Sequence, residues 1–255
     1  MQKHRRAVVA LGLAALFLGA TCLPAVAADP PKPSVVDTWM VWVKDGHVAP
    51  FEAAMKVYVA WRKAAGEGRA WFAYTPVAGN DLTHYVFRAG PHFWKDFDAT
   101  TEWERKSGEA IQWEKVAPHV ARMEHYFHDI DAEHSLWTDS EEYRLFGVTT
   151  LRLRPGSSGT MLDALTRVKK VAAEKKWPIG WSFQWIVGGL DDVLVVNPYR
   201  NYAEMAGPDT PFSKILAEAL GSEEAGKDLT KQLWSSFEAG HYTIYSSRPD
   251  LSTPR

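Results

Sequence analysis

The sequence predicts an α+β fold made of two tandem copies of one β-α-β-β-α-β unit. Three observations support this prediction: positions that recur about 110 residues apart, a glycine-containing turn in the middle of each half, and a helical pattern before each turn. The recurring positions are Trp71 with Trp181, Gly79 with Gly189, and Asp81 with Asp191. A repeat of this length indicates two copies of a complete supersecondary unit.

The first half contains four β-rich runs and two helical patterns. Apolar residues recur at helical steps between Phe51 and Ala65, with Pro50 near the start and Gly66 just past the end. The dipeptide Gly79-Asn80 favours a tight hairpin because both residues accept positive φ. A second helix is expected around residues 103–116. The β-rich runs cover residues 35–43, 71–77, 82–87 and 121–127.

The second half repeats this order. A helical pattern runs from Met161 to Ala172, with Ser157 or Ser158 available as its cap, and Pro178 lies beyond its end. Further helix is expected over residues 212–237. The β-rich runs cover residues 143–153, 181–187, 193–196 and 241–245, and the turn Gly188-Gly189 joins the middle two.

These elements define the expected boundaries along the chain. Residues 29–131 form the first repeat and residues 143–247 the second. The segment between them, residues 132–142, is rich in acidic side chains and is expected to be a solvated linker. Residues 248–255 contain two prolines and are expected to form a flexible tail.

The first 28 residues predict a signal peptide. Three basic residues precede an apolar stretch over residues 7–18, and small residues follow up to Ala28. The apolar stretch is about a dozen residues, short of the ~20 that a membrane-spanning helix needs. We therefore expect cleavage near Ala27 or Ala28, no membrane span in the mature chain, and a periplasmic or secreted protein. An uncleaved anchor is the alternative.

The cysteine content and the net charge exclude several kinds of function. The only cysteine, Cys22, lies in the expected signal peptide, so the mature chain would have no disulfide, thiolate nucleophile or cysteine-ligated metal. Loss of three basic residues and no acidic one changes the formal charge from -2 to -5. This balance argues against a nucleic acid as partner.

The order of strands and helices in each half resembles that of a known supersecondary unit. A split βαβ unit of this kind is ferredoxin-like, and its helices cover one face of the sheet only. The chain resembles the dimeric α/β-barrel superfamily in its fused, tandem form, which includes antibiotic-biosynthesis-type monooxygenases, haem-degrading enzymes and chlorite-dismutase-like haem proteins. The resemblance implies an intramolecular α/β barrel and a monomer. We expect the two sheets to bury their free faces against each other through Trp71, Tyr85, Phe127, Trp181, Phe183, Trp185 and Val195.

Histidines are the candidate catalytic residues, because imidazole moves protons near neutral pH. The dipeptides His125-Tyr126 and His241-Tyr242 begin the last strand of each half, so we expect them at equivalent places, as ligand contacts or as acid–base groups. The alternative is a structural pair inherited from the duplication. His84 is a third candidate, since it lies in mid-strand where the second half has a leucine.

Strand side chains are predicted to line an apolar ligand pocket with a few polar groups. The alternative is that the aromatic ones are core. The candidate ligand-binding residues are Trp71, Tyr74, Tyr126, Trp181, Gln184, Trp185 and Tyr242.

No metal site is predicted. Four histidines lie between His119 and His134, but His125 and His128 are three apart on an expected strand and so project to opposite faces. No cofactor is predicted either. Haem is the alternative, because one axial histidine among His84, His125 and His241 would be enough.

The sequence thus predicts an exported protein that binds a small apolar or aromatic ligand in a barrel pocket, with monooxygenase-like or isomerase-like activity as its catalytic form. The alternatives are a non-catalytic binding protein of the cell envelope, an interaction protein with a packed barrel, and a haem-binding protein. No hydrolase, nucleotide-binding or zinc-protease motif is present, so the reaction, the ligand and the existence of an activity stay open.

Overall fold

The computed structural model describes residues 32–138, 142–189 and 192–253, so the predicted signal peptide lies outside the described residues. The first half follows the predicted β-α-β-β-α-β order, and its first strand has the predicted bounds. Its elements are β1 (Val35–Val43), α1 (Val48–Ala64), β2 (Trp71–Ala78), β3 (His84–His92), α2 (Asp96–Ser107), α3 (Glu109–Trp113), the 3₁₀ turn η1 (Ala117–His119) and β4 (Val120–Leu136).

The second half has the same order. Its last helix begins at a serine cap, where the Ser222 hydroxyl accepts a hydrogen bond from the Ala225 amide. None of the helices in the described ranges is long and apolar enough to cross a membrane. The elements are β5 (Leu145–Leu153), α4 (Ser158–Glu174), β6 (Trp181–Val187), β7 (Asp192–Tyr199), η2 (Ala203–Ala206), α5 (Phe212–Leu220), α6 (Glu223–Ser235), β8 (Phe237–Ser247) and η3 (Pro249–Leu251).

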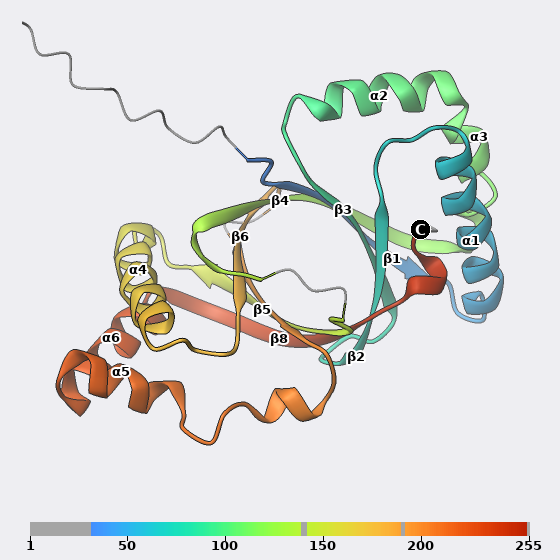
Figure 1. Ribbon diagram of the computed structural model, residues 1–255. Coiled ribbons are helices and arrows are strands. Elements are labelled where there is room, and N and C mark those ends of the chain that lie inside the picture. The colour runs from blue at the N-terminus through green and yellow to red at the C-terminus, as the bar shows by residue number, and fades with distance from the viewer. Residues whose placement is uncertain (1–31, 139–141, 190–191, 254–255) are drawn as a thin grey trace, which may run out of the picture. The chain divides into compact units, whose positions relative to one another are not determined.

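The strands of the described residues close into a barrel in the order β1-β3-β2-β8-β5-β7-β6-β4 (Figure 1). Every neighbouring pair is antiparallel. Each half contributes four consecutive strands of this order. The halves join at two seams, β2 with β8 and β4 with β6. The predicted intramolecular barrel of two ferredoxin-like repeats is therefore confirmed.

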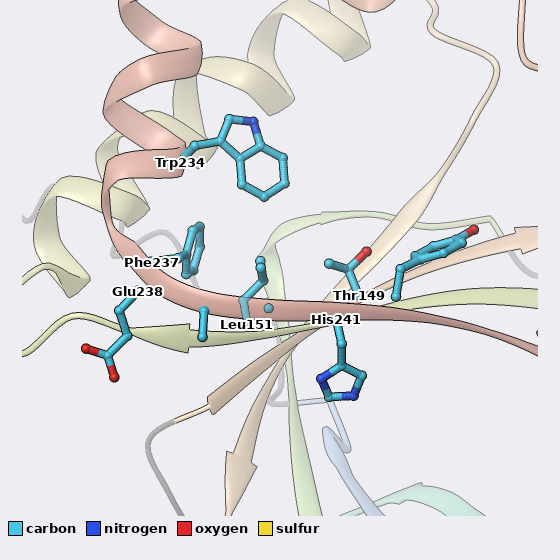
Figure 2. A pocket seen from close by; sticks show the side chains of 9 residues that line it. Thr149, Leu151, Trp234, Phe237, Glu238 and His241 are labelled. Carbon is cyan, nitrogen blue, oxygen red and sulfur yellow. The ribbon is translucent and has the colours of Figure 1, made fainter. Parts of the chain in front are cut away.

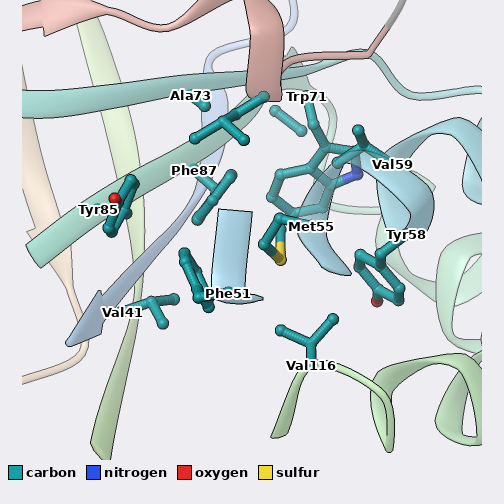
Figure 3. Packing of buried hydrophobic residues seen from close by; sticks show 12 residues of the cluster. Val41, Phe51, Met55, Tyr58, Val59, Trp71, Ala73, Tyr85, Phe87 and Val116 are labelled. Atoms are coloured by element: carbon teal, nitrogen blue, oxygen red, sulfur yellow. The ribbon is translucent and has the colours of Figure 1, made fainter. Parts of the chain in front are cut away.

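Helices cover the outside of the barrel, and each half has its own core between helix and sheet. In the first half, Phe51 and Met55 of α1 pack against Trp71, Tyr85 and Phe87 of the sheet (Figure 3). In the second half, α4 covers a corresponding cluster on β5 to β8, and a further cluster joins α4 to α5 and α6. These clusters hold the helices to the barrel through burial of apolar area.

The expectation for the two sheet faces is wrong. Trp71, Tyr85, Trp181, Phe183 and Trp185 do not face the opposite sheet but belong to the helix-facing cores. Phe127 likewise packs against Trp94 and Phe97, beside α2. The barrel interior is lined by the alternate residues of the same strands, since successive side chains of a strand point to opposite faces.

A buried charge network crosses the helix–sheet interface of the first half. The Glu67 carboxylate accepts hydrogen bonds from Arg62 of α1 at 2.5 and 2.8 Å and from Arg69 at 3.0 Å. Arg69 also donates to Asp37 of β1 at 2.7 Å, and Arg62 donates to Glu104 of α2 at 2.9 Å. The network ties three elements of the first half together.

The ends of the two halves differ from the expected boundaries. Strand β4 continues to Leu136, five residues into the segment expected as a linker. The segment expected as a flexible tail is packed: Leu251 is fully buried in the core of the first half, and the Thr253 amide donates to the Trp71 carbonyl at 2.8 Å. Pairing with β2 and burial of a leucine outweigh the two prolines there.

Candidate functional site

An open hollow of about 410 Å³ lies on the helix-facing side of β5 and β8, beside the end of α6 (Figure 2). Its volume falls in the range of ordinary small-ligand sites. Two large aromatic side chains at its rim are unusually accessible: Trp234 is 55% exposed and Tyr242 is 45% exposed. The lining residues are Thr149, Leu151, Trp234, Phe237, Glu238, Ala239, Gly240, His241 and Tyr242.

Small residues of the second half create this hollow. Thr149 pairs with Tyr242 in β5 and β8, as Trp39 pairs with His125 in β1 and β4. Thr149 and Trp39 are 110 residues apart and face the helices in their own halves. Thr149 therefore leaves open a space that a tryptophan fills in the first half, where the Trp39 ring stacks on His125 with 4.0 Å between centroids.

Tyr242 is held at the edge of the hollow by neighbours on β5 and β7. Burial raises the pKa of Tyr242, and Tyr199 donates a hydrogen bond to its hydroxyl. That hydroxyl lies against Gly147, where an added Cβ would collide with it. The Tyr242 ring is thus fixed with its hydroxyl protonated at neutral pH.

The two His-Tyr dipeptides are not at equivalent places. The pairing register matches His125 with Tyr242, one residue away from the expected match with His241. A shift of one residue moves a side chain to the other face of a strand. Consequently His125 faces the helices, whereas His241 points away from Trp234 and Leu151, to the other side of β8 (Figure 2).

His125 forms a histidine–carboxylate pair on the outside of the first half. Its Nε2 lies 2.8 Å from Oδ1 of Asp37, whose other oxygen accepts from Arg69. The His125 side chain is 33% exposed, and its ring contacts Trp39 and Phe127. With the Nε2 proton donated to Asp37, Nδ1 is the nitrogen that can accept a proton.

The remaining candidates divide between the two faces. His84, Tyr74, Tyr126 and Gln184 alternate with the helix-facing residues and so line the barrel interior. There Nε2 of His84 lies 3.1 Å from the Tyr245 hydroxyl, and burial lowers the pKa of His84. Trp71, Trp181 and Trp185 are in the helix-facing cores. The structure therefore brings Tyr242 alone of the predicted ligand-binding set to the hollow.

Solved structures of similar fold extend over nearly the whole chain. A proposed monooxygenase from Fusobacterium nucleatum matches with a TM-score of 0.56 and 9% identity, covering 84% of this chain and 91% of that one. An anthrone oxidase-like protein matches with a TM-score of 0.54 and 11% identity, covering 88% and 95%. The chain has the dimeric α/β-barrel fold. A chlorite dismutase variant from Candidatus Nitrospira defluvii also matches, with a TM-score of 0.52, 11% identity and coverage of 86% and 93%.

Sequence comparison adds nothing to this α/β-barrel assignment. No protein-family profile matches the chain, and no curated protein matches it. At such low identity the structural likeness identifies the fold, and function has to be argued from the site.

The three candidate histidines of this α/β barrel do not fit the role of an axial haem ligand. His84 is 4% exposed and bonded to Tyr245, and His125 is stacked on Trp39 and bonded to Asp37. The His241 side chain points away from the hollow. Within the described ranges, no group of three or more His, Cys, Asp or Glu side chains could hold a metal ion.

Sequence reasoning missed several polar residues of the barrel. Asp37, Thr38 and Arg88 lie in strands whose other residues are mostly apolar, and His128 was considered only as a metal ligand. The signal was present, because a charged side chain inside an apolar strand needs a partner. Its partners come from distant strands, so the sequence does not identify them.

Proposed function

We propose that the protein is exported and that it binds a small apolar or aromatic molecule in the hollow between β5, β8 and α6. The observation that carries the proposal is the hollow itself, about 410 Å³ in volume and rimmed by exposed aromatic rings. An exposed aromatic surface beside a concavity is typical of a ligand site. The hollow also argues against the alternative of an interaction protein, which assumed a fully packed barrel without any pocket.

The chemistry of the hollow selects a flat, mostly apolar ligand. Trp234 and Phe237 offer ring faces and edges, and Leu151 supplies an aliphatic floor. Aromatic pairs of this kind add about 0.5–1.5 kcal/mol beyond area burial. The hydroxyls of Thr149 and Tyr242 and the carboxylate of Glu238 are lining groups that can hydrogen-bond a substituent of the ligand.

Filling the hollow tests this proposal. Thr149→Trp introduces the residue that occupies the corresponding place in the first half, and we expect it to weaken binding of 2-naphthol by about tenfold or more. Thr149→Ser keeps the hydroxyl without filling the hollow and serves as the matched control. Titration calorimetry measures both, and equal affinity for 2-naphthol in Thr149→Trp and the unsubstituted protein would contradict the proposal.

A catalytic role is the second candidate, and the His125–Asp37 pair favours it. The imidazole is oriented by a carboxylate, is partly accessible, and lies beside Trp39 and Phe127. A base in this setting can remove a proton from an activated carbon of an aromatic substrate, which is the first step of an isomerase-like or cofactor-free monooxygenase-like reaction. Two neighbours of the fold are named as a proposed monooxygenase and an anthrone oxidase-like protein.

Oxygen uptake with anthrone as the probe tests the catalytic candidate. Anthrone loses a proton from its methylene carbon before it reacts with oxygen. His125→Ala and Asp37→Asn should each lower the rate by about 10²-fold or more, the usual size of a general-base contribution. His241→Ala, on the opposite face of its strand, is the control. No uptake above the uncatalysed rate, or full activity in His125→Ala, removes this candidate.

Export and a monomeric state are also proposals. The basic, apolar and small-residue order of the first 28 residues supports export, and the closure of the barrel within one chain supports a monomer. The intact mass of the protein recovered from the periplasm of an expressing host tests cleavage near Ala28. Sedimentation of the same sample tests the monomer.

A further inference from the structure

Arg88 lies in the middle of β3 with its side chain in the barrel interior. Its Nε donates to the Thr38 hydroxyl at 3.2 Å, and one terminal nitrogen donates to the Gln184 side-chain oxygen at 2.6 Å. The same nitrogen lies 3.3 Å from Nδ1 of His128. Three strands, β1, β4 and β6, thus supply neutral partners that fix the guanidinium in one orientation.

No carboxylate of the described residues lies within ion-pair distance of Arg88. The two buried arginines at the helix–sheet interface are different: Arg62 pairs with Glu67 and Glu104, and Arg69 pairs with Asp37 and Glu67. A buried cation is costly unless an anion compensates it. Arg88 therefore has hydrogen-bond partners but lacks the negatively charged partner that Arg62 and Arg69 have.

The surroundings of Arg88 do not supply a negative charge by ionising. Burial raises the pKa of Tyr74, and it raises the pKa of Tyr245 to about 12, so both hydroxyls stay neutral. Burial and the positive charge of Arg88 hold the pKa of His128 well below its ordinary value, so its imidazole is neutral as well. Burial lowers the pKa of Arg88 itself, but a guanidinium stays protonated in proteins, so the surroundings of Arg88 keep a net positive charge at neutral pH.

Arg88 is half-buried as a residue, and an exposed aromatic side chain is paired with it across the strands. The second terminal nitrogen of Arg88 forms no hydrogen bond within the described residues. Phe72 of β2 is directly opposite Arg88 in the strand pairing and is 40% exposed. Side chains opposite each other share a face of the sheet, so a ligand that reaches the guanidinium also meets the Phe72 ring.

We propose that the barrel interior is a second ligand site, which binds a small aromatic carboxylate through Arg88 and the ring of Phe72. The carboxylate supplies the missing counter-charge and accepts the unused N–H groups of the guanidinium, the pairing for which arginine geometry is suited. Thr38, Gln184 and His128 orient the arginine for this contact. This site lies on the opposite side of the strands from the hollow and does not depend on the function proposed for the hollow.

Calorimetric titration of the full mature chain with benzoate and with benzamide tests the site, because the two probes share a ring and differ in charge. The unsubstituted protein should prefer benzoate by about tenfold or more. Arg88→Gln should lose this preference. Gln184→Glu should lose it too, because it places a carboxylate at the position of the group that Arg88 now contacts at 2.6 Å. Arg105→Gln removes an exposed arginine and should keep the preference.

Each outcome decides the matter. Loss of the benzoate preference in Gln184→Glu, with retention in Arg105→Gln, supports the site even where Arg88→Gln does not fold. Equal binding of benzoate and benzamide at millimolar concentration, or an unchanged benzoate preference in Gln184→Glu, overturns it. Thr149→Trp separates the two sites: it should leave the benzoate preference intact while it weakens binding of 2-naphthol.

Discussion

Replacement of Glu67 by glutamine should destabilise the protein strongly, although it preserves the shape of the side chain. The Glu67 carboxylate is 3% exposed and accepts hydrogen bonds from Arg62, Arg69 and the Trp71 indole. Glutamine removes the charge that compensates two buried guanidinium groups. Removing one partner of a buried ion pair typically costs about 3–5 kcal/mol.

The lower end of this range applies here. Arg62 keeps Glu104 at 2.9 Å, and Arg69 keeps Asp37 at 2.7 Å, so neither cation is left without an anion. We therefore expect Glu67→Gln to lower the free energy of unfolding by about 3 kcal/mol. For a domain of this size, that corresponds to a fall in Tm of about 6–12 °C.

Urea denaturation of the two proteins at several pH values measures the effect. Burial raises the pKa of the Glu67 carboxyl, but the hydrogen bonds and charges of Arg62 and Arg69 outweigh burial and hold the pKa below the ordinary value of 4.5. Since the folded-state pKa is the lower one, the contribution of Glu67 is present above about pH 4.5 and is lost as the pH falls through the folded-state pKa. The stability gap should therefore close in acid.

Glu102→Gln is the matched control, since Glu102 pairs with Arg105 and Lys106 on the exposed surface of α2. Solvent screens exposed pairs of this kind, so Glu102→Gln should change the free energy of unfolding far less than Glu67→Gln does. A loss of the same size in both variants, or a gap for Glu67→Gln that does not depend on pH, would refute the argument from the buried network.

Two further predictions concern the ends of the fold and its interior. Leu251→Ala should cost about 3 kcal/mol in urea denaturation, because Leu251 is fully buried, whereas Leu82→Ala at an exposed position should cost less than about 0.5 kcal/mol; similar small losses would mean that the terminal segment is not part of the core. The ring signals of His128, assigned by comparison with His128→Gln, should not titrate between about pH 5 and 8. Its folded-state pKa lies well below 6.5, so the unfolded chain takes up a proton first, and stability should fall as the pH drops below that value.

The order of elements could be predicted from the sequence, but the orientation of the strands could not. The strands at Val35–Val43 and Trp181–Val187 have the predicted bounds. In an open sheet, the polar face of a strand is the solvated one. Here both faces of each strand are covered, by helices outside and by other strands inside, so alternation of polarity does not tell which face is which. Trp71 and Trp181 were therefore assigned to the wrong side.

The site was harder to predict because it depends on register. The His-Tyr dipeptides look equivalent in the sequence, but a one-residue offset in the β5–β8 pairing separates His125 from His241. Sequence spacing does not specify that offset. The hollow exists because Thr149 has no bulky ring at the position where Trp39 has one in the first half. A small residue at a single position forms no recognisable sequence motif. The sequence shows Arg88 as a lone cation within a strand. It does not show that the side chains facing Arg88 from β1, β4 and β6 are all neutral.

The placement of Leu251 has a consequence for the order in which the chain can fold. Leu251 completes a core whose other buried members lie between Val41 and Val116. Synthesis from the N-terminus therefore leaves the first half without this apolar contact until residue 251 has been made. The β2–β8 seam imposes the same wait, since β8 follows all the other strands of the described residues along the chain. The first half can therefore reach its native packing only after the second half has been made.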